Sequence, residues 1–188
     1  MPIGNAYATG NIIAFIDQYH VKNKALAVLD IGCGMGHNGF IFREMFDIRY
    51  MRLKPKDWMH SLEGIEVFED YRNPVWDYYY NKVTVEDCLK VLPALADAKY
   101  DIIFATEVLE HFEKQKVYEL LDLLLTKITA DGSIIITIPV GKKDAVLAQK
   151  NAHGNVHERH RTYLQFEDFQ RYHIIYKVNN GIFMISKK

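Results

Sequence analysis

Cysteine is scarce in this sequence. The two cysteines, Cys33 and Cys88, make no Cys-x-x-Cys metal site or redox pair. Such sparing use of cysteine is typical of a reducing compartment. We therefore expect a cytoplasmic protein in which both thiols pack as small buried side chains.

Long apolar runs are also missing. No stretch approaches the roughly 18 apolar residues that a membrane-spanning helix needs, and no N-terminal signal pattern is present. We expect a soluble protein with no membrane partner.

Neither sign of charge is in excess. Lys and Arg total 23 and Asp and Glu total 24, which leaves a formal net charge of -1. Without a global positive field, the net charge gives no support to nucleic acid as a partner. Repeats, low-complexity tracts and linkers are absent too. A chain of 188 residues that is 49% apolar therefore predicts one domain over residues 1–188.

Short apolar runs, often β-branched, alternate with segments long enough for helices. The runs that predict strands are residues 25–33, 62–67, 81–87, 100–108 and 132–140, and the segments that predict helices are residues 9–22, 37–47, 113–127 and 166–172. This alternation predicts an α/β fold with a parallel sheet covered on both faces. Near the end of the chain, Asn179-Asn180-Gly181 separates two further runs and predicts a hairpin, so the last strand should be antiparallel.

Two segments fit this plan less well. Residues 48–60 carry four Lys or Arg residues with Tyr50 and Trp58, which leaves two interpretations open, a substrate lid or a surface excursion packed on the body. Residues 70–82 are rich in aromatics. They predict packing beneath a crossover that Pro74 interrupts, with a role in lining a pocket as the alternative.

A glycine-rich loop, LDIGCGMGHNG at residues 29–39, follows the first predicted strand. From Gly34 to Gly39 its spacing is G-x-G-x-x-G, which suits a dinucleotide or another nucleotide-bearing cofactor. Asp30 distinguishes between these two kinds of cofactor, because its carboxylate repels a pyrophosphate but attracts a cationic amino-acid tail. Asp30 also has a simpler interpretation as a turn residue.

Two further carboxylates end the next two predicted strands. Glu66 is placed to accept hydrogen bonds from ribose hydroxyls, a role that many nucleotide cofactors share. Asp87, in VTVEDC, is placed near an adenine amino group, although an acid that starts a turn is the alternative interpretation.

Taken in order, these motifs resemble those of class I S-adenosylmethionine-dependent methyltransferases. The matching stretches are VLDIGCGMG, GIEV, VED, YDIIFATEVLEHF and KITADGSIIITIPV, within roughly residues 9–188. The resemblance implies a single-domain, Rossmann-like, seven-stranded and mostly parallel sheet with an antiparallel last strand. It also implies S-adenosylmethionine as cofactor and S-adenosylhomocysteine as product. The cofactor-binding residues that it implies are Asp30, Gly32, Cys33, Gly34, Gly36, Glu66, Val67, Asp87, Cys88, Thr106 and Glu107.

The acceptor is indicated less directly. The Asp/Asn-Pro-Pro-Tyr/Phe motif of amino-methylating enzymes does not follow the fourth predicted strand, so we expect an oxygen acceptor on a small molecule. His111 is the candidate catalytic base, because histidine titrates near neutral pH. His157 and His160 are weaker candidates.

The stretch EVLEHF also leaves a divalent metal open. It is similar to the stretch by which ubiquinone-pathway O-methyltransferases and small-RNA 2′-O-methyltransferases help to bind a metal. If the stretch is helical, Glu107, Glu110 and His111 share one face, and His160 matches the register of a further histidine found in some relatives. A metal-free site is the favoured interpretation.

Two other functions remain open. One is a methyltransferase-fold protein or subunit that binds S-adenosylmethionine without turnover. The other, less favoured, is an NAD-dependent oxidoreductase. The oligomeric state is not indicated.

Overall fold

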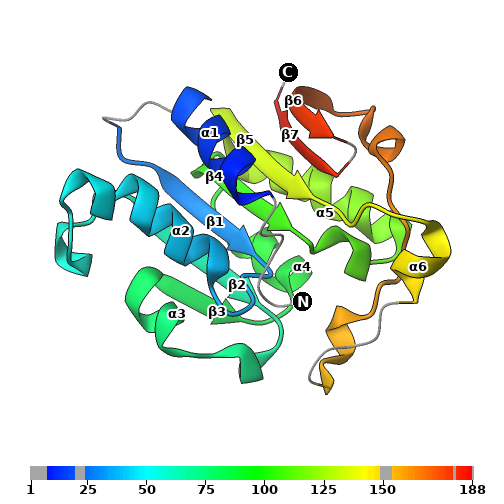
Figure 1. Cartoon of the computed structure of the whole chain (residues 1–188), viewed down its shortest axis with the longest axis horizontal. Helices are drawn as coiled ribbons and strands as arrows, with labels where there is room; N and C mark the ends of the chain where they lie inside the picture. The colour runs from blue at the N-terminus through cyan, green and yellow to red at the C-terminus, as the bar shows by residue number, and fades with distance from the viewer. Residues whose placement is uncertain (1–7, 20–23, 149–153, 180, 188) are drawn as a thin grey trace.

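The computed structural model describes residues 8–19, 24–148, 154–179 and 181–187. A single seven-stranded sheet runs through the molecule in the order β3-β2-β1-β4-β5-β7-β6 (Figure 1). Its strands are β1 (Ala27–Ile31), β2 (Ser61–Glu66), β3 (Lys82–Val85), β4 (Tyr100–Thr106), β5 (Ile128–Thr137), β6 (His173–Asn179) and β7 (Ile182–Ser186). The helices are α1 (Thr9–Tyr19), α2 (His37–Phe46), α3 (Pro74–Tyr79), α4 (Cys88–Val91), α5 (Lys114–Lys127) and α6 (Lys143–Leu147).

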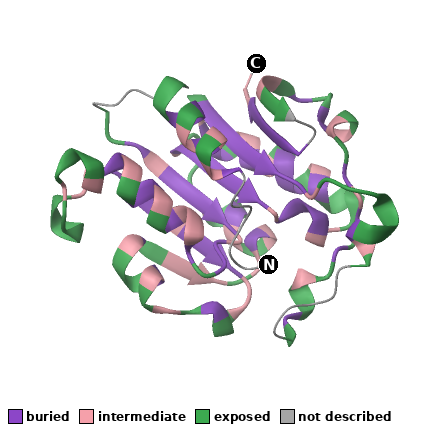
Figure 2. Ribbon diagram, in the orientation of Figure 1, coloured by how far each residue is buried: buried purple, intermediate pink, exposed green. Residues whose placement is uncertain are grey.

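Helices cover both faces of the sheet, and the alternation of side chains along β4 shows how. Ile102 and Phe104 join the apolar cluster that includes α1 and α2, whereas Ile103 and Ala105 join the cluster that includes α5. All seven residues of β4 are buried, and the central strands form the buried layer of Figure 2. The expected mostly parallel sheet with helices on both faces is confirmed.

The hairpin at the end of the chain is confirmed as well. β7 lies antiparallel between β5 and β6, with Ile136 opposite Phe183 and Tyr176 opposite Met184. Asn180, in the predicted turn, lies outside the described residues, as does the end of the predicted helix 9–22. The predicted helix at 166–172 is instead a short 3-10 helix, η8 (Phe166–Phe169).

The basic, aromatic insertion at residues 48–60 follows α2 and lies at the amino-terminal edge of the parallel strands (Figure 1). Buried Asp47 fixes it, because Asp47 Oδ1 accepts hydrogen bonds from Arg52 Nε at 2.8 Å and from the backbone N–H of Met59 at 2.9 Å. Trp58 stacks on Tyr79 with the ring centroids 6.1 Å apart. The interpretation as a packed surface excursion is therefore favoured over a lid.

The longest described helix, α5, has 14 residues. Among the described residues no helix combines the length and the apolar character needed to cross a membrane.

Candidate active site

A cavity of about 390 Å³ opens at the carboxyl-terminal ends of β1, β2 and β4. Parallel strands place their carboxyl ends together at one edge, which is where α/β sheets bind ligands. Most of the residues proposed from the sequence line this cavity: Gly32, Cys33, Gly34, Glu66, Val67, Asp87, Cys88, Thr106, Glu107 and His111. Asp30 and Gly36 are not among its lining residues.

The glycine loop is shaped by its contacts with α3 and the residue that follows it. Gly36 has φ 90°, and a Cβ there would lie 2.6 Å from Val75 Cγ1. A Cβ on Gly39 would lie 2.3 Å from the ring of Tyr80. Both positions therefore exclude a side chain, the first through backbone strain and close contact, the second through close contact alone.

Asp30 lies beneath the loop rather than on the cavity wall. Its carboxylate is fully buried and accepts hydrogen bonds from Tyr80 Oη at 2.7 Å and from Asn38 Nδ2 at 3.0 Å. Burial raises the pKa of Asp30 to about 7. The expected direct contact with a cofactor stays a prediction; the contacts present here show Asp30 bracing the loop from below.

The aromatic segment at 70–82 supports the same loop. Buried Trp76 donates a hydrogen bond from Nε1 to the carbonyl of Gly34 at 2.7 Å, and Tyr71 lines the cavity and donates a hydrogen bond from its hydroxyl to Glu158. Trp76 therefore agrees with the packing interpretation of this segment, and Tyr71 agrees with the pocket-lining interpretation. The sequence showed the aromatic enrichment but not which rings reach the loop.

Glu66 ends β2 at the cavity wall and is held by backbone amides. Its Oε2 accepts from the N–H of Gly34 at 2.9 Å, and its Oε1 accepts from Val67 at 2.9 Å and Phe68 at 3.0 Å. Burial raises the pKa of Glu66, while these three donors oppose the rise. The carboxylate is thus fixed between the first two strand ends.

Asp87 is a capping residue at the cavity, and its contact with an adenine stays a prediction. Its Oδ1 accepts a hydrogen bond from the N–H of Leu89 at 2.9 Å and so caps α4, and the residue also lines the cavity.

The residues after β4 do not form the α-helix that would place Glu107, Glu110 and His111 on one face. Glu107 has φ 53°, and only Leu109–His111 form a 3-10 helix, η5. The Glu107 carboxylate accepts a hydrogen bond from Thr137 Oγ1 at 2.9 Å, and the residue lines the cavity. The helical grouping of Glu107 with Glu110 and His111 is therefore wrong, because the chain leaves helical geometry at the end of the strand.

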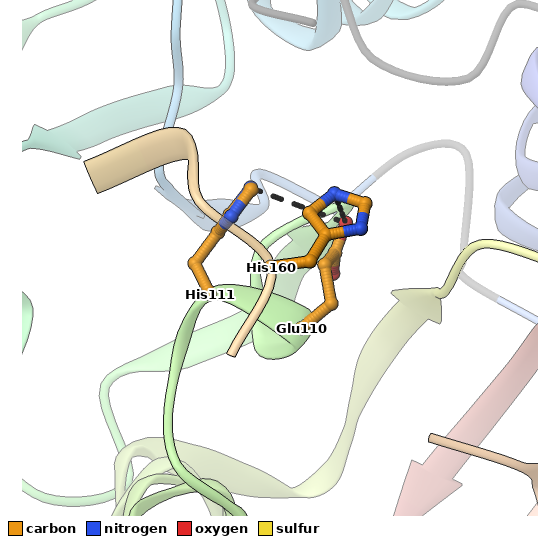
Figure 3. A group of neighbouring side chains, drawn as sticks. All are labelled: Glu110, His111 and His160. Carbon is orange, nitrogen blue, oxygen red and sulfur yellow. Dashed lines mark ion pairs between the residues drawn. The ribbon is translucent and has the colours of Figure 1, made fainter. Parts of the chain in front are cut away.

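Glu110, His111 and His160 nevertheless come together (Figure 3). Burial and then the charge of Glu107 raise the pKa of Glu110 well above its usual range. Burial and then neighbouring His160 lower the pKa of His111 to about 4. His111 is therefore neutral at physiological pH.

Residues far along the chain complete the cavity. Asn155, His157, Glu158 and Arg161 line it together with the strand ends. Sequence reasoning missed all of these except His157, since a loop without periodicity carries no signal of where it folds back.

Comparisons with known proteins agree with this geometry. Residues 6–172 match a family model described as a methyltransferase domain. No curated protein matches the chain.

Solved structures share the fold. A SAM-dependent methyltransferase from Archaeoglobus fulgidus is 23% identical with a TM-score of 0.53, over 72% of this chain and 55% of that one, so this chain spans about half of that relative. A TehB-like SAM-dependent methyltransferase from Corynebacterium glutamicum is 15% identical with a TM-score of 0.59, over 98% and 89% of the two chains. A 1,6-didemethyltoxoflavin-N1-methyltransferase from Burkholderia thailandensis, solved with bound 1,6-didemethyltoxoflavin and S-adenosylhomocysteine, is 14% identical with a TM-score of 0.58, over 97% of this chain and 77% of that one.

Proposed function

The chain belongs to the methyltransferase domain family and has the fold of S-adenosylmethionine-dependent methyltransferases; from this premise we propose that it transfers a methyl group from S-adenosylmethionine to an oxygen atom of a small molecule. The observation that carries the proposal is the cavity in which the glycine loop and the fixed Glu66 carboxylate meet.

The residues present fit this cofactor. A Cβ on Gly32 would lie 2.6 Å from Val108 Cγ2, so a side chain does not fit there, and the backbone of Gly32 itself lines the cavity. We assign the binding of the ribose hydroxyls to Glu66 and the binding of the adenine to Asp87 with Cys88. The loop from Gly32 to Gly34 would bind the methionine portion. Val67, Thr106 and Glu107 complete this proposed set.

Charge supports the same cofactor over a dinucleotide. Glu66, Asp87 and Glu107 all line the cavity, and such a wall favours a cationic sulfonium and ammonium over a pyrophosphate. The preference for a cationic cofactor, which the sequence analysis based on Asp30, is thus supported by carboxylates that line the cavity. The family match removes the NAD-dependent oxidoreductase from consideration.

S-adenosylmethionine supplies a methyl group on a positively charged sulfur. Such a transfer needs an acceptor held in line with the methyl group, and a hydroxyl acceptor must also lose its proton. We propose His111, on the cavity wall, as the catalytic residue that takes this proton. Its Nδ1 lies 3.4 Å from the carbonyl of Arg159, so Nε2 is the nitrogen free to accept it.

The size of the cavity suits a small-molecule ligand such as the proposed cofactor. About 390 Å³ falls in the range of about 300–1,000 Å³ found for small-molecule sites. The proposal of an oxygen acceptor rests on the absence of the amino-methylating motif from the sequence, since the fold alone does not determine the acceptor atom.

Calorimetric titration of the chain with S-adenosylhomocysteine and, separately, with NAD tests the cofactor. We expect one S-adenosylhomocysteine per chain and no heat from NAD; binding of NAD alone would overturn the proposal. Transfer of a labelled methyl group to a panel of small hydroxyl compounds, with amines as the comparison, then tests the acceptor. Binding of the product with no transfer to any acceptor would instead support a binding protein without turnover.

A further inference from the structure

We propose that the insertion at residues 48–60 binds the surface of a membrane that contains anionic lipids. The contact is peripheral and needs no spanning helix: apolar side chains at the tip of the insertion enter the headgroup region, and basic side chains bind the lipid phosphates. The proposal goes beyond methyl transfer and does not rest on it. It also replaces the expectation, drawn from the sequence, that the protein has no membrane partner.

The tip of the insertion exposes three large apolar side chains within four consecutive positions. Met51 is 77% exposed, Leu53 is 51% exposed and Tyr50 is 43% exposed. The insertion projects from the body beyond the end of α2 in Figure 1, and Figure 2 shows it as largely exposed. A single exposed apolar side chain is ordinary, whereas a group of them marks a surface that a partner covers.

Met51 has an unusual backbone conformation. Its φ of 63° lies in the left-handed region, which favours glycine or asparagine. Its side chain gains no burial in return, so neither packing within the chain nor backbone preference explains a methionine at this position. A partner that takes the side chain out of water does explain it.

Basic side chains accompany this apolar tip. Arg49, Lys54 and Lys56 are exposed and have no ion-pair partner among the described residues, and the insertion contains one acid, Asp57. Positive charge is thus concentrated here on a chain whose formal net charge is -1. Anionic headgroups complement this charge, because the surface of a bilayer that contains them attracts each Lys or Arg that comes near.

The inner side of the insertion is fixed to the body by Arg52. Its guanidinium donates hydrogen bonds to Asp47 and to the carbonyl of Phe46, and its Cζ lies 5.4 Å from the centroid of the Tyr50 ring. Arg52 is therefore occupied within the protein, whereas the three exposed cations remain for headgroups. Because the insertion is held in place before it binds, little ordering entropy is lost on contact.

A membrane suits this tip better than a nucleic acid or a protein. The phosphates of a nucleic acid would bind the cations, but the two most exposed apolar side chains, Met51 and Leu53, have no ring on which a base could stack. Apolar residues that bind a protein partner are typically packed in pockets, and these two side chains project instead. A fluid bilayer accepts projecting aliphatic side chains without a matching shape.

The insertion is also well separated from the candidate active site. It lies at the amino-terminal edge of the parallel strands, whereas the cavity opens at their carboxyl-terminal ends (Figure 1). Contact through the tip therefore leaves the cavity facing away from the bilayer. Substitutions in the tip should not disturb cofactor binding, so the two properties can be measured independently.

The test is co-sedimentation of the whole chain with vesicles of phosphatidylcholine alone and of equal parts phosphatidylcholine and phosphatidylglycerol. We expect binding to the anionic vesicles, binding to the neutral ones that is at least about tenfold weaker, and release as the salt concentration is raised. The double variants Met51→Ser/Leu53→Ser and Lys54→Gln/Lys56→Gln should each weaken binding to the anionic vesicles at least about tenfold.

Matched controls lie beyond β5, at the opposite edge of the sheet. Val140→Ser removes an apolar side chain that is 69% exposed, and Lys142→Gln/Lys143→Gln removes two exposed cations. Both controls should bind the anionic vesicles as the parent chain does. Circular dichroism checks that each variant is folded, and S-adenosylhomocysteine titrated into the same samples reports on the proposed function separately.

Three results would overturn the membrane contact. The first is a parent chain that does not bind anionic vesicles, and the second is equal binding by the parent chain and folded Met51→Ser/Leu53→Ser. The third is an equal loss of binding in the controls, which would show that the insertion is not the site. A single-stranded oligonucleotide tests the alternative partner: tighter binding to it than to vesicles, unchanged in Met51→Ser/Leu53→Ser, would assign the insertion to nucleic acid instead.

Discussion

The hydroxyl of Tyr80 donates a hydrogen bond of 2.7 Å to the Oδ2 of Asp30, and both side chains are buried beneath the glycine loop. The same hydroxyl accepts the backbone N–H of Gly39 at 3.1 Å. One phenol therefore ties the end of β1 to the first turn of α2, and the shape of the loop depends on it.

Removing that hydroxyl should destabilise the protein. Tyr80→Phe leaves a buried carboxylate oxygen and a buried N–H without a partner, so we expect a loss of about 1–3 kcal/mol in the free energy of unfolding, measured by urea denaturation. Tyr78→Phe, on the exposed side of α3, is the matched control. Equal stability of Tyr80→Phe and the parent chain would show that the hydroxyl does not support the loop.

The pKa of Asp30 predicts a dependence of stability on pH. Because its pKa is about 7 in the folded chain and 3.8 is its ordinary value, the folded state binds the proton more tightly. This contribution to stability is fully present below about pH 4 and is lost as the pH rises to about 7. At 1.36 kcal/mol per pKa unit, its full size is about 4 kcal/mol.

Asp30→Asn removes this titration. Compared with the variant, the parent chain should therefore lose free energy of unfolding between pH 5 and pH 8, as measured by urea denaturation at each pH. A parent-minus-variant difference that stays constant over this range would contradict the raised pKa.

Glu66 should contribute to cofactor affinity. Glu66→Ala removes the proposed ribose partner, so S-adenosylhomocysteine should bind more weakly by about 1–3 kcal/mol in calorimetry. Glu63→Gln serves as the control, because Glu63 is on the same strand but is held by Lys99 and Tyr100. An unchanged dissociation constant in folded Glu66→Ala would show that Glu66 is not the ribose partner.

His111 should matter for turnover more than for cofactor binding. We expect His111→Gln to lower kcat at least about tenfold with the identified acceptor, since a lost proton acceptor typically costs about 10²–10⁴-fold. The affinity for S-adenosylhomocysteine should change little. His157→Gln is the control, and full turnover in folded His111→Gln would remove His111 from the reaction.

Much of the fold follows from local patterns in the sequence. Apolar runs such as residues 100–108 mark buried parallel strands, and the Asn-Asn-Gly turn marks the final hairpin, because both depend on neighbouring residues. The strand ends then bring Glu66 and Asp87 to one edge by geometry alone. These parts of the site could be predicted without a structure.

Other parts depend on long-range packing. The burial of Asp30 by Tyr80 joins residues fifty positions apart, and no local pattern encodes it. The positive φ of Glu107 replaces the assumed helix with a bend, and His160 meets Glu110 only through a loop that folds back. Glu110, His111 and His160 do lie close together, but the helical face expected to join Glu107 to Glu110 and His111 does not form.

The close contact between Gly39 and the ring of Tyr80 constrains how this sequence can evolve. A side chain at position 39 has no room while the ring is present, since a Cβ would lie 2.3 Å from it. A smaller residue at position 80 leaves a void and removes the donor to Asp30 Oδ2. Each substitution is thus harmful alone, while a larger residue at 39 becomes tolerable once the ring is gone. The two positions are epistatic, and lineages of this protein are expected to change them together or not at all.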